Sequence, residues 1–350
     1  MVGRDVPIQD APHEPVPFKY SITSYGSDFD VEGLIRRIER QDIYVPTFQR
    51  RFVWSLSQAS RFVESLLLGL PVPGIFLSRD GESKLLVIDG QQRLRSLLYF
   101  YNGVFEPTGR KFALTHVHPR FNGLTYRELD SEDKRRLNDS IIHATVIRQD
   151  YPDDGNSSIY FVFARLNTGA TLLQPQEIRV ALYHGPFDGL LNQLNENDDW
   201  RLLFGRVHSR RRDLELILRF LALYFSGEHY QKPMVLFLND FMGGNRYLER
   251  YPADEISKLF ERTVSLINRH IGNKAFKPRG ALNAAILDSV MVGVARNLSQ
   301  GQVDSGRLLE QYRRLLADES YQHATETATT DEENVQRRLH LATTAFKDAQ

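Results

Sequence analysis

The spacing of hydrophobic residues changes along the chain, and the change predicts two differently built regions. Up to about residue 185, some segments repeat apolar residues at helical spacing, whereas others are short apolar or alternating runs typical of strands. Beyond that point the apolar positions keep helical spacing, with only short breaks between segments. The sequence therefore predicts an α+β protein, in which a mixed α/β domain is followed by an all-helical domain.

Capping and turn residues mark the ends of the expected elements. Asp30 can cap a helix, Ser55 opens a capping box, and Asn102-Gly103 is a typical helix end. In the first region we expect helices over residues 31–41, 56–68, 91–102, 157–169 and 174–185, and strands over residues 75–79, 84–88 and 140–148. In the second region we expect helices over residues 214–225, 255–270, 280–298 and 305–317.

These elements suggest a division into three parts. Residues 1–27 are rich in proline and are expected to form an extended lead-in, residues 28–185 the mixed domain, and residues 186–350 the helical domain. The two strands over 75–79 and 84–88 flank Asp-Gly-Glu-Ser, which predicts a hairpin.

Composition excludes several classes of protein. The 44 basic and 44 acidic side chains cancel, so any contact with nucleic acid must come from a local patch. The absence of cysteine excludes disulfides, cysteine–zinc sites and a thiol nucleophile. Because no run approaches the ~20 apolar residues of a membrane span, and the first residues lack an apolar signal core, we expect a cytoplasmic protein with no membrane segment.

The motif Asp-Gly-Gln-Gln-Arg is the main candidate for chemistry, because it joins an apolar strand to a helix. A helix N-terminus carries unpaired N–H groups and a partial positive charge, and Gly90 allows a sharp turn and a close ligand. Arg93 lies in the first turn, where a bound phosphate would remove its unfavourable interaction with the helix dipole. Asp89 could orient Arg93, hold a Mg²⁺-bound water or polarise an attacking water. Gln91 and Gln92 could position ligand oxygens.

The alternative interpretation of this motif is purely structural. In it, Asp89 is an ordinary N-cap and the residues after it are solvated polar side chains. Short motifs match by chance at a high rate, so the spacing alone gives the two interpretations about equal weight.

Three further segments contain polar residues suited to binding. Gln49 and Arg50 lie among aromatic residues, a setting that suits anion binding but also suits an edge segment anchored to a core. Asn167 and Gly169 lie at the end of the expected helix over 157–169, and Asn167 could equally be a left-handed helix cap. Glu177 is a weaker candidate for a second metal carboxylate, since the first turn of a helix favours an acid anyway.

The densest basic run contains Arg210, Arg211 and Arg212. It could hold the backbone of DNA, although such runs are more often solvated loops before a helix.

Four blocks, taken together and in this order, resemble the GmrSD-type restriction proteins. The blocks are VPTFQRRFVWS, LGLPVPGIFL, VIDGQQRLRSL and FVFARLNTGATLLQPQEIR. The resemblance covers residues 28–185 and is to the GmrS-like N-terminal domain, also described as domain of unknown function 262. It implies a ParB/sulfiredoxin-like α/β core, in which a strand–loop–helix with a terminal Arg cradles nucleotide phosphates.

The resemblance also implies a function: binding or hydrolysis of a nucleoside triphosphate (NTP), with Mg²⁺, in bacterial defence against phage that carry modified DNA. The matching residues are those of the Asp-Gly-Gln-Gln-Arg motif, the upstream Gln-Arg pair and the downstream Asn-Thr-Gly block. We therefore expect nucleotide binding at Gln49, Arg50, Gly90, Arg93, Asn167 and Gly169. From the chemistry of the motif we expect catalysis at Asp89, Gln91, Gln92 and Arg93, with Asp89 as the metal ligand. Full-length relatives often continue into an HNH-type nuclease domain, which we do not expect in these 350 residues. DNA cleavage would then require a separately encoded nuclease partner.

Two classes of function stay open at this point. One is a slow, Mg²⁺-dependent NTP hydrolase, and the other is a non-catalytic module that binds modified DNA or a partner protein within a defence complex. The sequence does not determine the nucleotide base or the oligomeric state, and a homo-oligomer is compatible with it.

Overall fold

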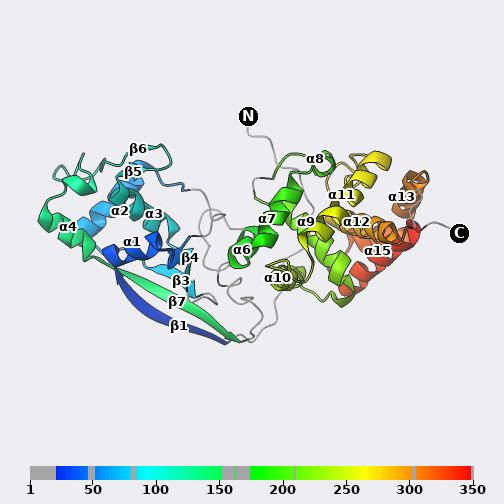
Figure 1. The fold of residues 1–350 in the computed structure, drawn as a ribbon, viewed down its shortest axis with the longest axis horizontal. Coiled ribbons are helices and arrows are strands. Elements are labelled where there is room, and N and C mark those ends of the chain that lie inside the picture. The colour runs from blue at the N-terminus through cyan, green and yellow to red at the C-terminus, as the bar shows by residue number, and fades with distance from the viewer. Residues whose placement is uncertain are drawn as a thin grey trace. The chain divides into compact units, whose positions relative to one another are not determined.

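The structure, a computed structural model, describes residues 21–45, 52–79, 84–151, 162, 174–208, 210–301 and 305–347 (Figure 1). Its contacts divide the chain into two compact units, Lys19–Leu173 and Gln174–Gln350. We call these the N-terminal unit and the helical unit, and describe each by itself. The predicted turn over residues 80–83 lies outside the described residues, as does the predicted helix over 157–169 apart from residue 162.

A mixed five-stranded sheet forms one layer of the N-terminal unit. Its strands are β1 (Ser21–Asp30), β2 (Ile43–Tyr44), β3 (Ile75–Arg79), β4 (Leu85–Asp89) and β7 (Ile141–Tyr151), in the order β1-β7-β3-β4-β2. The β1/β7 and β3/β4 pairs are antiparallel, whereas the β3/β7 and β2/β4 pairs are parallel. The predicted antiparallel pairing of β3 with β4 is therefore confirmed, as is the strand predicted over residues 140–148. A separate short ladder joins β5 (Val104–Phe105) to β6 (Arg110–Lys111).

Strand β1 was not predicted by the hydrophobic pattern. It is ten residues long and lies at the edge of the sheet, paired only with β7 among the named strands. Most of its described side chains are exposed, so its sequence lacks the apolar alternation of a half-buried strand.

Local signals define the helices of this unit. They are α1 (Val31–Glu39), α2 (Leu56–Leu67), α3 (Gln91–Asn102) and α4 (Ser131–Asn138), with a 3₁₀ turn, η1, at Tyr126–Glu128. Asp30 caps α1 by accepting a hydrogen bond from the Gly33 N–H at 2.6 Å, and Ser55 and Gln58 form the predicted capping box of α2. Gly103 ends α3 in the left-handed conformation, as its position after Asn102 predicts.

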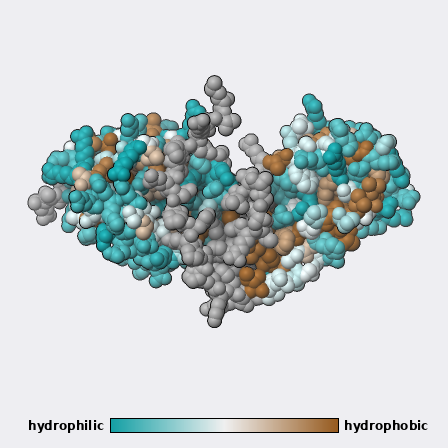
Figure 2. Space-filling view, turned by 180° about the vertical axis from the view of Figure 1, so that it is seen from behind, coloured by the Kyte–Doolittle hydropathy of each residue, from teal (hydrophilic) through white to brown (hydrophobic). Residues whose placement is uncertain are grey.

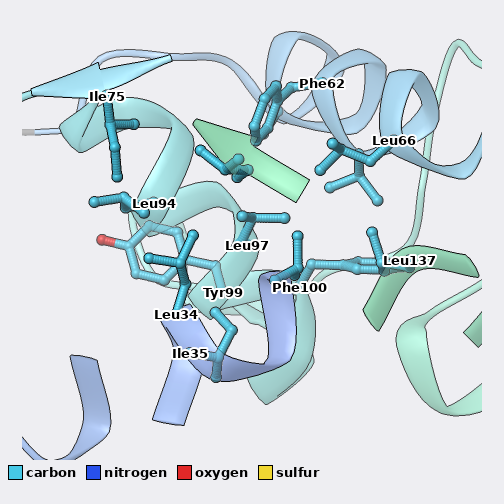
Figure 3. Packing of buried hydrophobic residues seen from close by; sticks show 14 of the residues in the cluster. Leu34, Ile35, Phe62, Leu66, Ile75, Leu94, Leu97, Tyr99, Phe100 and Leu137 are labelled. Atoms are coloured by element: carbon cyan, nitrogen blue, oxygen red, sulfur yellow. The ribbon is translucent and has the colours of Figure 1, made fainter. Parts of the chain in front are cut away.

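One hydrophobic core joins the helices to the sheet. Figure 3 shows side chains of α1, α2, β3 and α4 packed around α3. The labelled core residues are Leu34, Ile35, Phe62, Leu66, Ile75, Leu94, Leu97, Tyr99, Phe100 and Leu137, all of them buried. This packing holds α3, and with it the loop between β4 and α3, rigidly against the sheet.

The described residues from 174 onward form helices. These are α6 (Pro175–Leu182), α7 (Pro186–Asn195), α8 (Asp198–Phe204), α9 (Arg212–Ser226), α10 (Met234–Gly244), α11 (Ala253–His270), α12 (Ala284–Ser299), α13 (Leu308–Ala317), α14 (Glu319–Glu326) and α15 (Glu332–Ala345), with a 3₁₀ turn, η2, at Gly227–His229. Helix α12 is buried along almost its whole length. Its Gly293 lets α15 approach so closely that a Cβ there would lie 2.7 Å from the Ala342 carbonyl carbon.

The predicted α+β class, with a mixed α/β region followed by helices, is confirmed. In each unit, hydrophilic residues cover much of the described surface on the face drawn in Figure 2, with apolar patches between them. Every helix in the described parts of the chain is too short or too polar to cross a bilayer.

Candidate functional site

The loop between β4 and α3 strongly favours glycine at position 90. Gly90 has a φ of +101°, and a Cβ on it would lie 2.4 Å from Ile75 Cγ2 and 2.9 Å from Ile75 Cβ. Gly90 is also the N-cap of α3, and no side chain caps this helix end. Asp89 is the last residue of β4, so the alternative of an Asp N-cap is wrong.

Arg93 is held beside this loop by two acceptors. Its Nη2 donates to Asp89 Oδ2 at 2.8 Å and to the Gly74 carbonyl at 3.0 Å. The Arg93 side chain is 14% exposed and that of Asp89 is 46% exposed, so the carboxylate faces solvent more than the guanidinium does. Arg93 Nε is buried and meets no hydrogen-bond partner in the described structure. The structure thus brings Asp89 and Arg93 together, with the arginine charge compensated by the carboxylate.

Gln92 has a structural contact that the sequence did not reveal. Its Oε1 accepts hydrogen bonds from the backbone N–H groups of Val53 at 3.0 Å and Trp54 at 3.2 Å. These bonds tie the segment before α2 to the first turn of α3. Because they span 38 and 39 residues of sequence, no local pattern could have predicted them.

Gln91 lies next to Gln92 in the same turn, and its side chain is buried. Gln49 and Arg50 lie outside the described residues. The described residues before and after them, up to 45 and from 52, have defined contacts. On one side β2 pairs with β4 at Leu85 and Leu86, and on the other side Val53 is bound by Gln92.

Asn167 and Gly169 also lie outside the described residues. Glu177 lies in the helical unit, where its Oε2 accepts a hydrogen bond from the Gln174 N–H at 2.6 Å and lies 3.4 Å from Arg210 Nη2.

Over the part of the chain that the structure describes, no three His, Cys, Asp or Glu side chains gather as a metal site. Asp89 is therefore a single candidate ligand, which would need oxygens from a nucleotide or water to complete a Mg²⁺ site.

The basic run in the helical unit is paired with acids. Arg210 lies 3.4 Å from Glu177, Arg211 lies 3.9 Å from Asp188, and Arg212 forms an ion pair with Glu215. The three arginine side chains are 29%, 29% and 15% exposed, respectively, so they are not a solvated loop of free cations.

Two of these carboxylates respond differently to their surroundings. Burial raises the pKa of Asp188, although Arg211 and His184 oppose the shift. Burial also acts to raise the pKa of Glu215, but Arg212, Arg179 and Arg219 outweigh it and the pKa is lowered. Glu215 is thus ionised and firmly held by buried guanidinium groups.

The fold and the site define an α/β domain that presents a strand–glycine–helix loop with an adjacent arginine, followed by a helical region. Residues 31–184 match the family model described as the GmrSD restriction endonuclease, N-terminal domain. The match supports the GmrSD-type resemblance of this region. A comparison with curated proteins found no match.

Proposed function

We propose that this protein is the nucleotide-binding component of a bacterial restriction-type defence system. In this proposal the β4–α3 loop binds the phosphates of an NTP with Mg²⁺, in the manner of a ParB/sulfiredoxin-like core. The observation that carries the proposal is the left-handed conformation of Gly90, which packs against Ile75. Gly90 begins α3 without a side-chain cap, and the Arg93 guanidinium lies close to this helix end. An anion at such a helix end is stabilised by unpaired N–H groups and by the helix dipole.

The Arg93–Asp89 ion pair has a defined role in this proposal. Without nucleotide, Asp89 neutralises the arginine; with nucleotide, a phosphate oxygen replaces Asp89 on Arg93, and the freed carboxylate takes up Mg²⁺ or a metal-bound water. The exposure of Asp89 makes this exchange of partners feasible without unfolding. Arg93 would keep its bond to the Gly74 carbonyl, which fixes its direction.

The remaining site residues act around this centre. Gln49, Arg50, Asn167 and Gly169 would complete the nucleotide site, and Gln91 would help to orient the attacking water. The Oε1 of Gln92 is already engaged by Val53 and Trp54, so Gln92 would contribute only its amide N–H groups. Hydrolysis would depend on in-line water and on charge neutralisation by Mg²⁺ and Arg93.

The proposal links the nucleotide to DNA through a separate nuclease, in the cytoplasm. DNA contact by Arg210, Arg211 and Arg212 would require each arginine to leave its carboxylate. A decrease in DNA affinity on replacing all three, with a shallower dependence on salt, is the result that would support this contact.

Nucleotide titration calorimetry with Mg²⁺ tests the proposal. Arg93→Ala removes a charge-assisted contact of about 1.5–3 kcal/mol, so we expect affinity to fall by about 10- to 150-fold. Arg36→Ala is the matched control, because Arg36 pairs with the acid four residues before it on α1 and lies in the same unit. Asp89→Asn should keep metal-free nucleotide binding and lose the gain from Mg²⁺. If the wild type binds none of the four common NTPs at millimolar concentration, the proposal fails.

A non-catalytic binding module is the second candidate function. It is favoured by the pairing of Arg93 with Asp89, which leaves the loop neutral without any ligand. Equal rates of phosphate release by wild type, Asp89→Ala and Arg93→Ala would select this candidate over the hydrolase.

A further inference from the structure

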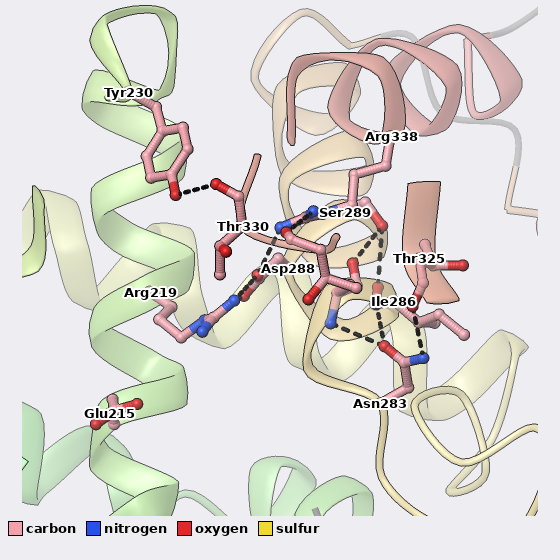
Figure 4. Close-up of polar contacts among 12 residues, drawn as sticks. Glu215, Arg219, Tyr230, Asn283, Ile286, Asp288, Ser289, Thr325, Thr330 and Arg338 are labelled. Atoms are coloured by element: carbon pink, nitrogen blue, oxygen red, sulfur yellow. Dashed lines mark hydrogen bonds and ion pairs between the residues drawn. The ribbon is translucent and has the colours of Figure 1, made fainter. Parts of the chain in front are cut away.

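A small cavity lies in the helical unit between α12, α13 and α14. Its volume is about 140 Å³, and it opens to solvent beside the exposed residues 278 and 279, which precede α12. Figure 4 shows three of its lining residues, Asn283 and Ile286 at the start of α12 and Thr325 of α14. An apolar cavity of roughly this volume is large enough for one benzene molecule. The space therefore suits a single six-membered ring.

Most of the cavity wall is apolar. Pro278, Ala281, Ile286 and Leu316 supply aliphatic surface, and the fully buried Tyr321 lines the same space. Burial of an apolar ring against such a wall is favourable, whereas a strongly hydrated ligand would lose its water without compensation.

The polar side chains in the wall of the cavity are bonded within the protein. Asn283 Oδ1 accepts hydrogen bonds from two backbone N–H groups of α12, at 2.9 and 3.1 Å, and its Nδ2 donates to the Thr325 carbonyl at 3.1 Å. The Thr325 hydroxyl donates to the Tyr321 carbonyl at 2.9 Å, and the Tyr321 hydroxyl lies 2.8 Å from that of Ser289. Water in a cavity needs about two to four polar partners, so it is poorly held here and an apolar ligand displaces it readily.

The charges at the rim of the cavity compensate each other. Arg279 and Glu326 form an ion pair of 2.7 Å, and their side chains are 72% and 42% exposed. An ionic ligand would gain little from this pair, because each group already has a partner and both face water. The cavity therefore favours a neutral ligand.

Gln322 offers a hydrogen-bond acceptor at the cavity. Its Nε2 donates to the Leu316 carbonyl at 2.8 Å, and this bond fixes which end of the amide is the oxygen. The side chain is half-buried in the cavity wall, and its Oε1 accepts no hydrogen bond from the residues that the structure describes. A ligand with one hydroxyl group would supply the missing donor.

We propose that this space, here called the α12–α14 cavity, binds a neutral phenol. The ring fills the apolar space, and the hydroxyl donates to Gln322 Oε1. The cavity belongs to the helical unit and lies beyond residue 184, where the match to the family model ends. The proposal therefore stands or falls independently of nucleotide binding at the β4–α3 loop.

Fluorine NMR of para-fluorophenol with the full chain is the test. A saturable change in the ligand signal gives the Kd, which we expect to be on the order of 1 mM for one ring and one hydrogen bond. Fluorobenzene has the ring without the hydroxyl, so it should bind roughly 2- to 12-fold more weakly. An excess of benzoate should not displace the phenol, because its charge would have to leave water.

Two variants test the wall and the acceptor separately. Ala281→Leu adds aliphatic atoms to the cavity wall and should weaken binding of para-fluorophenol by about 10-fold or more. Ala253→Leu makes the same change at a half-buried position of α11, outside the cavity, and should keep the wild-type Kd. Gln322→Met keeps the length of the side chain and removes the acceptor. It should weaken binding of para-fluorophenol roughly 2- to 12-fold and leave that of fluorobenzene unchanged.

The expected pattern differs from a general loss of structure, which would weaken both ligands together. Saturable binding to wild type and Ala253→Leu, weaker binding to Ala281→Leu, and loss of the preference for the hydroxyl in Gln322→Met support the proposal. Absence of saturable binding to wild type, equal affinity of wild type for the two fluorinated ligands, displacement by benzoate, or an unchanged Kd in Ala281→Leu overturns it. If Ala281→Leu does not fold, the comparison of the two ligands in Gln322→Met decides.

Discussion

Replacing Gly90 with alanine adds a Cβ at the most tightly packed position of the candidate site. A φ of +101° is unfavourable for any residue with a Cβ, at about 1–2 kcal/mol. The new Cβ would also lie 2.4 Å from Ile75 Cγ2, a contact that forces the packed β3 strand or α3 to shift. Overpacking of this kind costs about 1–3 kcal/mol, so we expect a total loss of about 2–5 kcal/mol in the free energy of unfolding.

Gly103→Ala provides the matched control. Gly103 has a φ of +74° at the other end of α3, and nothing lies within 4 Å of the position that a Cβ would take there. This variant carries the backbone cost without the clash, so it should lose only about 1–2 kcal/mol. The difference between the two variants measures the close approach of Gly90 to Ile75.

The assay is hydrogen exchange along a urea gradient, read by mass spectrometry on peptides from the N-terminal unit. This separates the unfolding of that unit from the unfolding of the helical unit. Repeating Gly90→Ala in an Ile75→Ala background completes a double-mutant cycle, in which removal of Cγ2 should relieve part of the loss. If Gly90→Ala and Gly103→Ala cost the same, and the cycle shows no coupling, the steric account of the loop is refuted.

Two further predictions concern the helical unit. Asp288→Asn leaves Arg219 and Arg338 buried without a carboxylate, so it should lower the free energy of unfolding by about 3–5 kcal/mol. The control, Asp254→Asn, changes an exposed acid and should alter the free energy of unfolding by less than about 0.5 kcal/mol. Urea unfolding measures both. Burial raises the pKa of Tyr312 to about 12, so the folded state holds this proton more tightly than the unfolded state. Stability should therefore fall as pH rises from the ordinary tyrosine pKa of about 10 towards 12, and Tyr312→Phe should reduce that slope; an unchanged slope would contradict the assignment.

The Arg93 site illustrates how far a motif can be interpreted before a structure is known. The apolar strand, the glycine and the arginine in the first helical turn were all predicted from a short run of adjacent residues. The pairing of Arg93 with Asp89 could be expected from the sequence, because the two residues are four positions apart. The hydrogen bond of Gln92 to the segment before α2 could not be expected, because its partner could lie anywhere in the chain.

The basic run shows the opposite case. Sequence presents Arg210, Arg211 and Arg212 as a concentrated positive patch, but the fold supplies each with an acid. Two of those acids, Glu177 and Asp188, lie on α6 and α7, well before the run. A charge run is an interface candidate only if tertiary packing leaves it uncompensated.

The sequence by itself determined the helix caps at Asp30 and Ser55, the left-handed helix end at Gly103, the pairing of β3 with β4 and the change from mixed to helical structure. These features depend on hydrogen bonds and hydrophobic spacing within a few residues, which the order of residues specifies directly. Only the tertiary structure decided the edge position of β1, the contacts of Gln92 and the partners of the arginine run. These depend on packing between residues tens of positions apart, where a side chain's partner is set by the fold and not by its neighbours in sequence.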